Sequence, residues 1–239
     1  MAGHSKWANI KHRKGRQDAI KGKLFTRLIR EISVSARLAG GDINSNPRLR
    51  SAVEAANSAN MPKEKIDRAI KKGSGGDESQ NLEEIRYEGY SPGGAAIIVD
   101  CVTDNRNRTV ADVRHVFSKA GGNLGTEGCV AFLFKKLGIL TVIDIEDEDA
   151  FLEKILELDV EDVQKISDNS FGVICAPESY FDVKDLLLDS GVALSDSEIT
   201  LVPTLQKELK GKHQEQTEKM IDLVEDVDDV QKIYTNAVF

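Results

Sequence analysis

Residues 139–202 decide the fold class of this chain, and they read ILTVIDIEDEDAFLEKILELDVEDVQKISDNSFGVICAPESYFDVKDLLLDSGVALSDSEITLV. Short aliphatic runs alternate in this stretch with two longer segments that have helical spacing. The predicted order is strand, helix, strand, strand, helix, strand, over residues 139–145, 150–158, 163–167, 172–176, 181–188 and 199–202. This is the split β-α-β order of ferredoxin-like α+β domains.

The sequence on either side of this stretch repeats the pattern. Two strands flank the turn Ser91-Pro92-Gly93-Gly94, and a helix, a strand, a second helix and a closing strand follow along the chain. These elements are predicted over residues 85–90, 95–102, 110–120, 130–134, 214–224 and 231–238. Joining residues 95–136 to 213–238 gives the ferredoxin-like order again, so we expect a second such domain, interrupted by the first.

The first 72 residues predict three amphipathic helices. Leu24, Leu28 and Ile32 lie on one face of the first helix, which Gly40-Gly41 ends. Pro47 begins the second helix, and the third, after Met61-Pro62, ends at Gly73. Residues 73–79, of sequence GSGGDES, have the composition of a flexible linker.

The fold class is therefore α+β, with an N-terminal three-helix domain followed by two ferredoxin-like α+β domains, the second inserted into the first. We expect a basic helical domain with its linker at residues 1–78. The interrupted α+β domain takes residues 79–137 plus 204–239, and the inserted one takes residues 138–203.

Charge is distributed very unevenly along the chain. The net charge of the 239 residues is −8, yet residues 1–72 contain 17 Lys and Arg against 6 Asp and Glu. Residues 73–239 contain 15 basic and 34 acidic side chains. A polyanion is therefore attracted to the N-terminal end and repelled by the rest, and the overall acidity does not exclude nucleic-acid binding.

The N-terminal basic segment indicates a nucleic-acid-binding arm. Its cations occur together with glycines and with Trp7, the only tryptophan, which can stack on a base. The predicted contacts, which continue along one face of the first helix, are Lys6, Trp7, Lys11, His12, Arg13, Lys14, Arg16, Lys21, Lys23, Arg27 and Arg30. The alternatives are a solubilising tail whose Trp7 packs on the helical domain, and a mitochondrial presequence.

Residues 104–109, of sequence DNRNRT, lie between a predicted strand and a predicted helix. Asn107 or Thr109 can cap that helix, with Asp112 completing a capping box. Arg106 and Arg108 can supply a second phosphate or ribose contact. The two interpretations are compatible, and both stay open here.

The sequence contains no constellation typical of catalysis. The glycine-rich residues 121–128 follow a helix and lead into a strand, so they predict a helix stop and a turn instead of a phosphate-binding loop. The acids at 146–149 are explained by the dipole of the helix that they begin, and the four histidines lack metal-ligand spacing. We therefore expect a protein that is not an enzyme, with no metal and no cofactor.

Cysteine usage and hydropathy indicate the compartment. Three widely spaced cysteines, Cys101, Cys129 and Cys175, fit a reducing environment, and the longest aliphatic run is only residues 95–99. The expected location is the cytoplasm, with no membrane partner.

Several motifs closely resemble the YebC family over the whole chain. They are GHSKW at 3–7, IKHRK at 10–14, GKLFTRL at 22–28, REI at 30–32, NMPK at 60–63, RAIKKG at 68–73, YEGY at 87–90 and DNRNRT at 104–109. The resemblance implies a three-domain cytoplasmic protein of a family described as probable transcriptional regulators that bind DNA. Mitochondrial relatives resemble translational activators, and bacterial members have been linked to ribosomes.

Charge and resemblance together lead to two functional hypotheses. The first is a non-enzymatic, DNA-binding transcriptional regulator. The alternative is a ribosome-associated translation factor or translational activator that binds structured RNA. Both use the same attraction to phosphates. A nuclease is disfavoured, because no carboxylate cluster is placed for metal-assisted chemistry.

Overall fold

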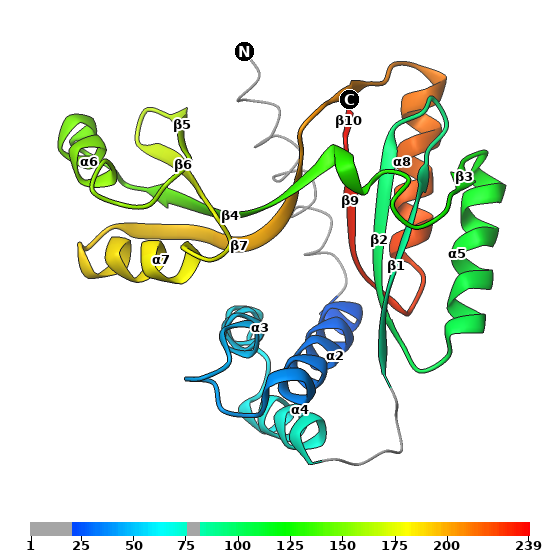
Figure 1. Cartoon of the computed structure of the whole chain (residues 1–239), viewed down its shortest axis with the longest axis horizontal. Coiled ribbons are helices and arrows are strands. Elements are labelled where there is room, and N and C mark those ends of the chain that lie inside the picture. Colours follow the sequence, from blue (N-terminus) through cyan, green and yellow to red (C-terminus); the bar gives the residue numbers. More distant parts are fainter. Residues whose placement is uncertain (1–20, 76–81) are drawn as a thin grey trace. The chain divides into compact units, whose positions relative to one another are not determined.

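The computed structural model describes residues 21–75 and 82–239. The chain forms two compact units. One consists of Phe134–Thr204, and the described part of the other consists of residues 21–75, residues 82–133 and Leu205–Phe239. The architecture is α+β, as predicted: a helical region precedes two four-stranded sheets (Figure 1).

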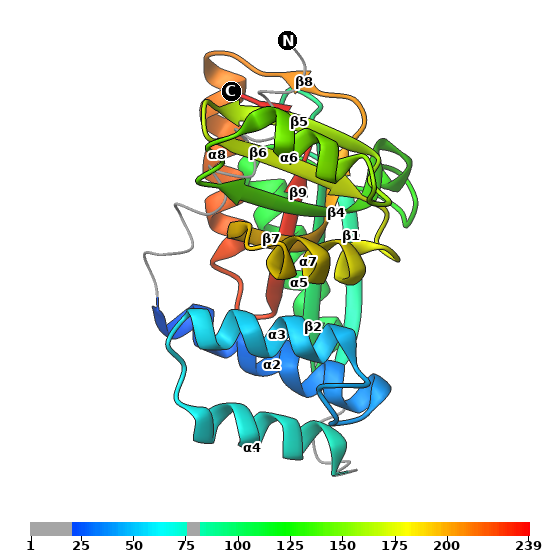
Figure 2. The ribbon, with the colours of Figure 1, turned by 90° about the vertical axis from the view of Figure 1, so that its left-hand side faces the viewer.

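Three helices make up residues 21–75. They are α2 (Lys21–Ala39), α3 (Pro47–Ser58) and α4 (Lys63–Ser74). Helix α2 packs against both of the others (Figure 2). Ile32 and Ala36 of α2 meet Leu49 of α3 and Ile66 of α4 in a buried apolar cluster, which is the core that the helical spacing predicted.

Asn46 fixes the connection between α2 and α3. Its side-chain oxygen caps α3 by accepting the N–H of Leu49 at 3.1 Å, and its amide nitrogen donates to the carbonyls of Ser35 and Gly40, both at 2.8 Å. Substitution of a capping residue of this kind typically costs about 1 kcal/mol. Pro47 then takes the first helical position, where no backbone N–H is needed.

Gly73 has a different role from the one that the sequence predicted. Helix α4 does not end at this residue but continues to Ser74, with Gly75 as its C-cap. A Cβ on Gly73 would lie 2.2 Å from the Ser33 carbonyl oxygen of α2. The missing side chain therefore permits the close approach of α2 and α4.

The first sheet has the strand order β3-β1-β2-β9 and is antiparallel throughout. Helices α5 and α8 share its buried core, in which Val99 meets Phe117 and Met220. The strands are β1 (Glu83–Tyr90), β2 (Ala96–Thr103), β3 (Asn123–Leu124) and β9 (Val230–Thr235), and the helices are α5 (Arg106–Ala120) and α8 (Lys212–Glu225). A small parallel pair, β8 (Lys207–Glu208) with β10 (Ala237–Val238), completes this part.

The ferredoxin-like order of the first sheet is permuted along the chain. Counting from β2, the elements β2, α5, β3, α8 and β9 occupy the places of strand 1, helix 1, strand 2, helix 2 and strand 4. Strand β1, which precedes β2 in sequence, occupies the place of strand 3 between β3 and β2. The predicted hairpin of residues 85–90 and 95–102 thus supplies the central pair of this sheet.

The inserted unit has the ferredoxin-like order without permutation. Its sheet has the order β5-β6-β4-β7, and its helices α6 and α7 share one core with Leu140, Phe171 and Val173 on one sheet face. The elements are β4 (Phe134–Ile143), α6 (Glu148–Ile155), β5 (Asp162–Ser167), β6 (Ser170–Cys175), α7 (Tyr180–Asp189) and β7 (Ala193–Pro203).

Two sequence predictions were wrong in detail. Residues 130–134 are not a strand: a short 3-10 helix spans Ala131–Leu133, and β4 begins at Phe134. The predicted closing strand at 231–238 is divided into β9 and β10. The division occurs at the buried Asn236, whose side-chain oxygen accepts the N–H of Ala96 at 2.7 Å.

Candidate nucleic-acid interface

Most of the predicted arm lies outside the described residues. This applies to Lys6, Trp7, Lys11, His12, Arg13, Lys14 and Arg16. Lys21 is the first residue of α2, but its side chain is not described either. The contacts assigned to these residues stay predictions.

The basic stripe of α2 lies against acceptors of the same chain. Lys23 forms an ion pair with Asp226, with 2.6 Å between Nζ and Oδ1. Arg27 donates to the Glu225 carbonyl at 2.7 Å, and Arg30 donates to the Asp228 carbonyl and pairs with Asp229. The spacing correctly placed the three cations on one face, and in this structure that face contacts residues 225–229.

Asp229 is the buried centre of this contact. Its carboxylate accepts hydrogen bonds from Thr109 at 2.7 Å, Thr103 at 3.1 Å and Arg108 at 2.9 Å, and it pairs with Arg30 at 3.3 Å. Burial alone would raise the pKa of Asp229, but the hydrogen bonds from Thr109, Arg108 and Thr103 outweigh burial and hold that pKa below its usual range. The carboxylate is therefore charged at neutral pH.

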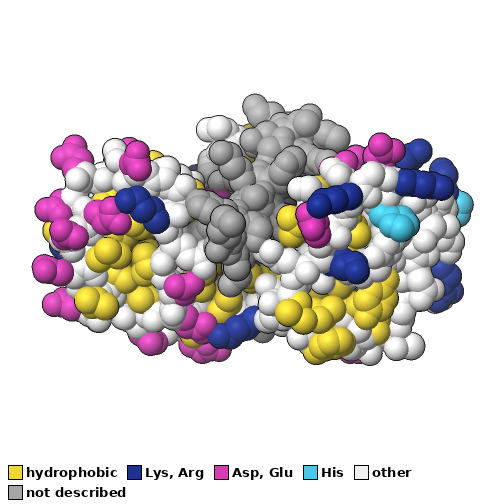
Figure 3. All heavy atoms as spheres, turned by 90° about the horizontal axis from the view of Figure 1, so that it is seen from above, with side chains coloured by type: hydrophobic (Ala, Val, Ile, Leu, Met, Phe, Trp, Pro, Cys, Tyr) yellow, Lys and Arg dark blue, Asp and Glu magenta, His cyan; other side chains and the backbone are white. Residues whose placement is uncertain are grey.

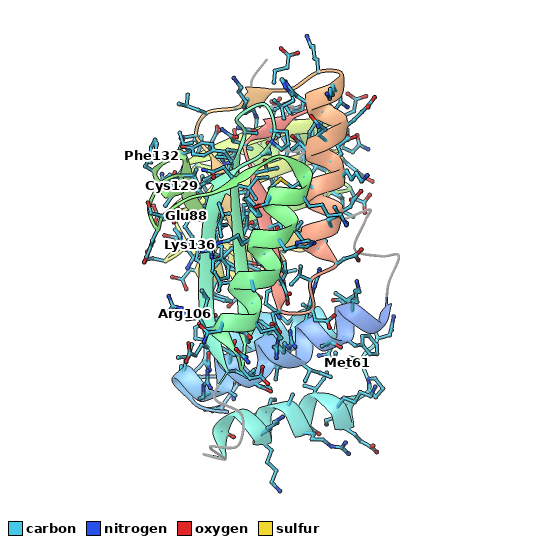
Figure 4. All side chains as sticks on the ribbon, turned by 90° about the vertical axis from the view of Figure 1, so that its right-hand side faces the viewer. Met61, Glu88, Arg106, Cys129, Phe132 and Lys136 are labelled. Atoms are coloured by element: carbon cyan, nitrogen blue, oxygen red, sulfur yellow. The ribbon has the colours of Figure 1, made fainter. Side chains whose placement is uncertain are left out.

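Arg106 and Arg108, the second predicted contact, have different surroundings in the structure. Helix α5 is capped by Asn105, whose side chain accepts the N–H of Arg108 at 3.1 Å. The predicted caps Asn107 and Thr109 were wrong: they lie two and four residues further along, inside the helix. Arg108 is engaged with Asp104 and Asp229, whereas Arg106 is exposed at the start of α5 (Figure 4).

Other cations of the helical region are also engaged within the chain. Arg48 bridges Glu31 and Glu84. Its burial lowers the pKa of the guanidinium, but the hydrogen bonds to these two carboxylates raise that pKa above its usual value overall. Arg50 donates to the Asn44 carbonyl at 2.9 Å, and Arg37 donates to the Leu82 carbonyl.

Helix α4 carries the largest group of exposed cations in residues 21–75. Its buried side consists of Ile66 and Ala69, and its exposed basic residues are Lys63, Lys65, Arg68, Lys71 and Lys72. Of these, Lys65 lies over the Phe25 ring, 5.5 Å from its centroid. We call Lys63, Arg68, Lys71 and Lys72 the α4 basic face. Its residues were not among the predicted contacts, although their charge and helical spacing were visible in the sequence.

The loop between β3 and β4 is organised around the buried carboxylate of Glu88, which was not among the predicted site residues. The Glu88 side chain accepts the backbone N–H groups of Gly128, Val130 and Ala131 at 2.8–2.9 Å. Tyr90 adds a hydrogen bond from its hydroxyl to the Cys129 carbonyl at 3.0 Å. Three donors on one carboxylate hold the loop backbone in a defined path.

Phe132 projects from this loop into solvent. The residue is 71% exposed, compared with 44% for Phe239. Figure 4 shows it near Glu88 and Cys129. Helical or strand periodicity cannot predict such a residue, because its exposure depends on the 3-10 turn at Ala131–Leu133.

The unit Phe134–Thr204 is strongly acidic. It contains 17 Asp and Glu but only 5 Lys. On the face shown in Figure 3, acidic side chains surround its apolar patch. A polyanion is therefore repelled by this unit, which leaves the helical region as the basic part of the described chain.

Residues 21–75 and 82–239 contain no group of three or more His, Cys, Asp or Glu side chains arranged to hold a metal ion. Within the same residues, the hydropathy of every helix is too low, or its length too short, for a membrane span. Cys101 and Cys175 are buried thiols, and burial raises their pKa to about 12 and about 11, far from the reactive range.

Comparison with known proteins gives matches along the whole chain. A model described as the TACO1/YebC protein N-terminal domain matches residues 5–76, and one described as the TACO1/YebC second and third domain matches residues 82–237. A "probable transcriptional regulatory protein" of Francisella tularensis subsp. mediasiatica is 54% identical over 239 residues, which are 100% of this chain and 96% of the relative.

A protein of the same description from Aromatoleum aromaticum is 56% identical over 238 residues, covering 100% of this chain and 99% of the relative. Among solved structures, the crystal structure of a conserved hypothetical protein from Aquifex aeolicus matches with a TM-score of 0.81 and 45% identity. The match covers 92% of this chain and 91% of that chain.

Proposed function

Because the chain belongs to the TACO1/YebC family, whose relatives are named probable transcriptional regulatory proteins, we propose that it is a cytoplasmic, non-enzymatic regulator that binds DNA. The observation that carries the proposal is the charge of residues 1–72, with 17 basic against 6 acidic side chains. The acidic remainder of the chain orients this end toward a polyanion.

The proposed interface combines the N-terminal arm with the α4 basic face. Lys11, Arg13 and Lys14 of the arm would pair with phosphates, and Trp7 would stack on a base. Arg68 and Lys71 lie three residues apart on α4 and are neighbours on the helix surface, so their side chains can reach successive phosphates. These contacts supply affinity without reading sequence.

The first test is the salt dependence of binding to duplex DNA. For B-DNA, log affinity against log salt falls by about 0.9 for each phosphate that is neutralised. Replacing Lys63, Arg68 and Lys71 by Ala should weaken binding and flatten the slope by up to about 2.7. The matched control replaces Lys119, Lys154 and Lys219, which are exposed on other elements. Equal effects in the two triple variants would remove α4 from the interface.

The arm is tested in the same way. Deletion of residues 1–20 should reduce affinity steeply, and the Lys11, Arg13 and Lys14 to Ala variant should flatten the salt slope by up to about 2.7. An unchanged slope would show that these side chains do not pair with phosphates.

Crosslinking in cells, followed by sequencing of both DNA and RNA, identifies the natural target. Recovery of promoter DNA is the expected result for a transcriptional regulator. Recovery of ribosomal RNA would overturn the DNA assignment and favour a ribosome-associated translation factor, with the same cations placed on structured RNA.

A further inference from the structure

Residues 225–229, of sequence EDVDD, connect α8 to β9, and four of the five are acidic. We call them the acidic turn. Its outer residues, Asp226 and Asp228, are exposed, whereas Asp229 is buried. The turn also contains the last carbonyls of α8, which carry the negative end of the helix dipole.

Every cation of the α2 stripe is engaged by this turn. Lys23 contacts the Asp226 carboxylate, Arg27 contacts the Glu225 carbonyl, and Arg30 contacts the Asp228 carbonyl and the Asp229 carboxylate. The three cations lie at spacings of four and three on one helix face, which is the arrangement that suits a row of phosphates. In this structure, anionic and carbonyl oxygens of the chain itself occupy their donors.

We propose that the acidic turn and nucleic acid compete for the α2 stripe, so that the turn acts as a built-in inhibitor of this part of the interface. The inference rests on the proposed function. Nucleic acid first engages the arm and the α4 basic face, and its phosphates then displace the turn from Lys23, Arg27 and Arg30.

The hydrogen bonds of Asp229 make the displacement reversible. A buried carboxylate that loses its partner is normally costly, because its charge is left uncompensated. Here Thr103, Thr109 and Arg108 all hold Asp229 independently of α2. When Arg30 leaves, the carboxylate keeps three donors, and the fold of the α+β part is preserved.

The pairs at the outer end are the ones that phosphate can replace first. Side chains of Lys23 and Asp226 are 39% and 63% exposed, so solvent and salt reach them. Arg27 and Arg30 are half-buried, and burial lowers the pKa of Arg27 although Glu225 and Asp226 counteract this effect. Displacement therefore proceeds from Lys23 inward to Arg30.

The test compares two variants that each remove two negative charges. D226N/D228N neutralises the exposed acids of the turn, and E215Q/E218Q neutralises two acids of α8 as a control for net charge. Affinity for a 25-base-pair duplex should be about two- to fivefold higher for D226N/D228N than for the control, the change expected from loss of an exposed ion pair. Its salt slope should also be steeper by about 0.9, because Lys23 no longer exchanges the Asp226 carboxylate for a phosphate.

Hydrogen exchange of the unchanged full-length chain supplies the second readout. Saturation with the same duplex should accelerate amide exchange at residues 225–229. The exchange rates at residues 215–218 should not change. Equal affinities and slopes in the two variants, with unaltered exchange at 225–229, would overturn the competition and leave the proposed function standing. If the unchanged chain and both variants all failed to bind the duplex, the proposed function itself would be overturned.

Discussion

Arg30 of α2 and Asp229, the residue directly before β9, form an ion pair with 3.3 Å between Nη2 and Oδ1. The same carboxylate accepts two further hydrogen bonds from threonine hydroxyls of β2 and α5. One buried side chain therefore joins the helical region to the sheet and fixes the start of α5.

Asp229→Ala should lower the free energy of unfolding by about 3 kcal/mol, because it leaves Thr103, Thr109 and Arg108 without their shared acceptor. Urea denaturation of the two proteins measures the difference. Asp228→Ala is the control: this side chain is exposed, and its replacement should change stability by no more than about 0.5 kcal/mol. Equal values for the two variants would contradict the central role of Asp229.

The stability that Asp229 contributes should depend on pH. Its pKa in the folded chain is below its usual range, so the unfolded chain binds this proton more readily than the folded one. The contribution is fully present above the unfolded value of about 3.9 and is lost as pH falls through the lower folded value. The stability difference between the unchanged chain and Asp229→Asn should therefore be constant from pH 5 to 7 and shrink below about pH 4. A difference that grows in acid would refute this assignment.

Glu88→Gln should loosen the loop that carries Phe132. The substitution replaces one acceptor oxygen by an N–H₂ group that faces backbone donors, which leaves at least one of the N–H groups of Gly128, Val130 and Ala131 unsatisfied. We expect a loss of about 2 kcal/mol and faster hydrogen exchange at residues 128–131. Glu127→Gln, at an exposed neighbouring position, should change neither quantity.

Phe132→Ala should leave the free energy of unfolding within about 0.5 kcal/mol of its original value, because the ring is 71% exposed. Phe117→Ala is the opposite case: its ring is fully buried among α5, α8 and the first sheet, and its removal should cost about 3–5 kcal/mol. Thermal or urea unfolding of the two variants measures this difference in stability. A large loss at Phe132 would show that its ring contributes to the core.

The elements that periodicity predicted well are those with one clear apolar side. The order of the inserted unit follows from the sequence because Phe151 and Ile155, and then Val183 and Leu187, recur at helical spacing between aliphatic strands. The permuted sheet could not be derived in the same way. Periodicity identified the hairpin of β1 and β2, but β3 has only two residues, Asn123 and Leu124, which is too short for an alternating pattern.

The candidate interface shows a similar limit. Spacing correctly placed Lys23, Arg27 and Arg30 on one face, yet the residues that meet them lie about 200 positions later in the chain. A sequence pattern reports which side chains share a face and not what covers that face. The sequence did not predict the burial of Asp229 and Glu88 for the same reason. Acidic residues are usually exposed, and tertiary contacts alone bury these two.

Replacing two glycines of the helical region by Ala should change the free energy of unfolding in opposite directions. Gly73→Ala places a Cβ 2.2 Å from the Ser33 carbonyl oxygen and 2.9 Å from the Ala36 Cβ, so α2 and α4 must separate. We expect a loss of at least about 2 kcal/mol, from overpacking that outweighs the better helix propensity of Ala. Gly22→Ala, in α2 with no atom within 4 Å of the new Cβ, should raise stability by about 0.5–1 kcal/mol through propensity alone. Urea denaturation measures both changes, and a stabilising Gly73→Ala would show that the two helices are not in close contact at this residue.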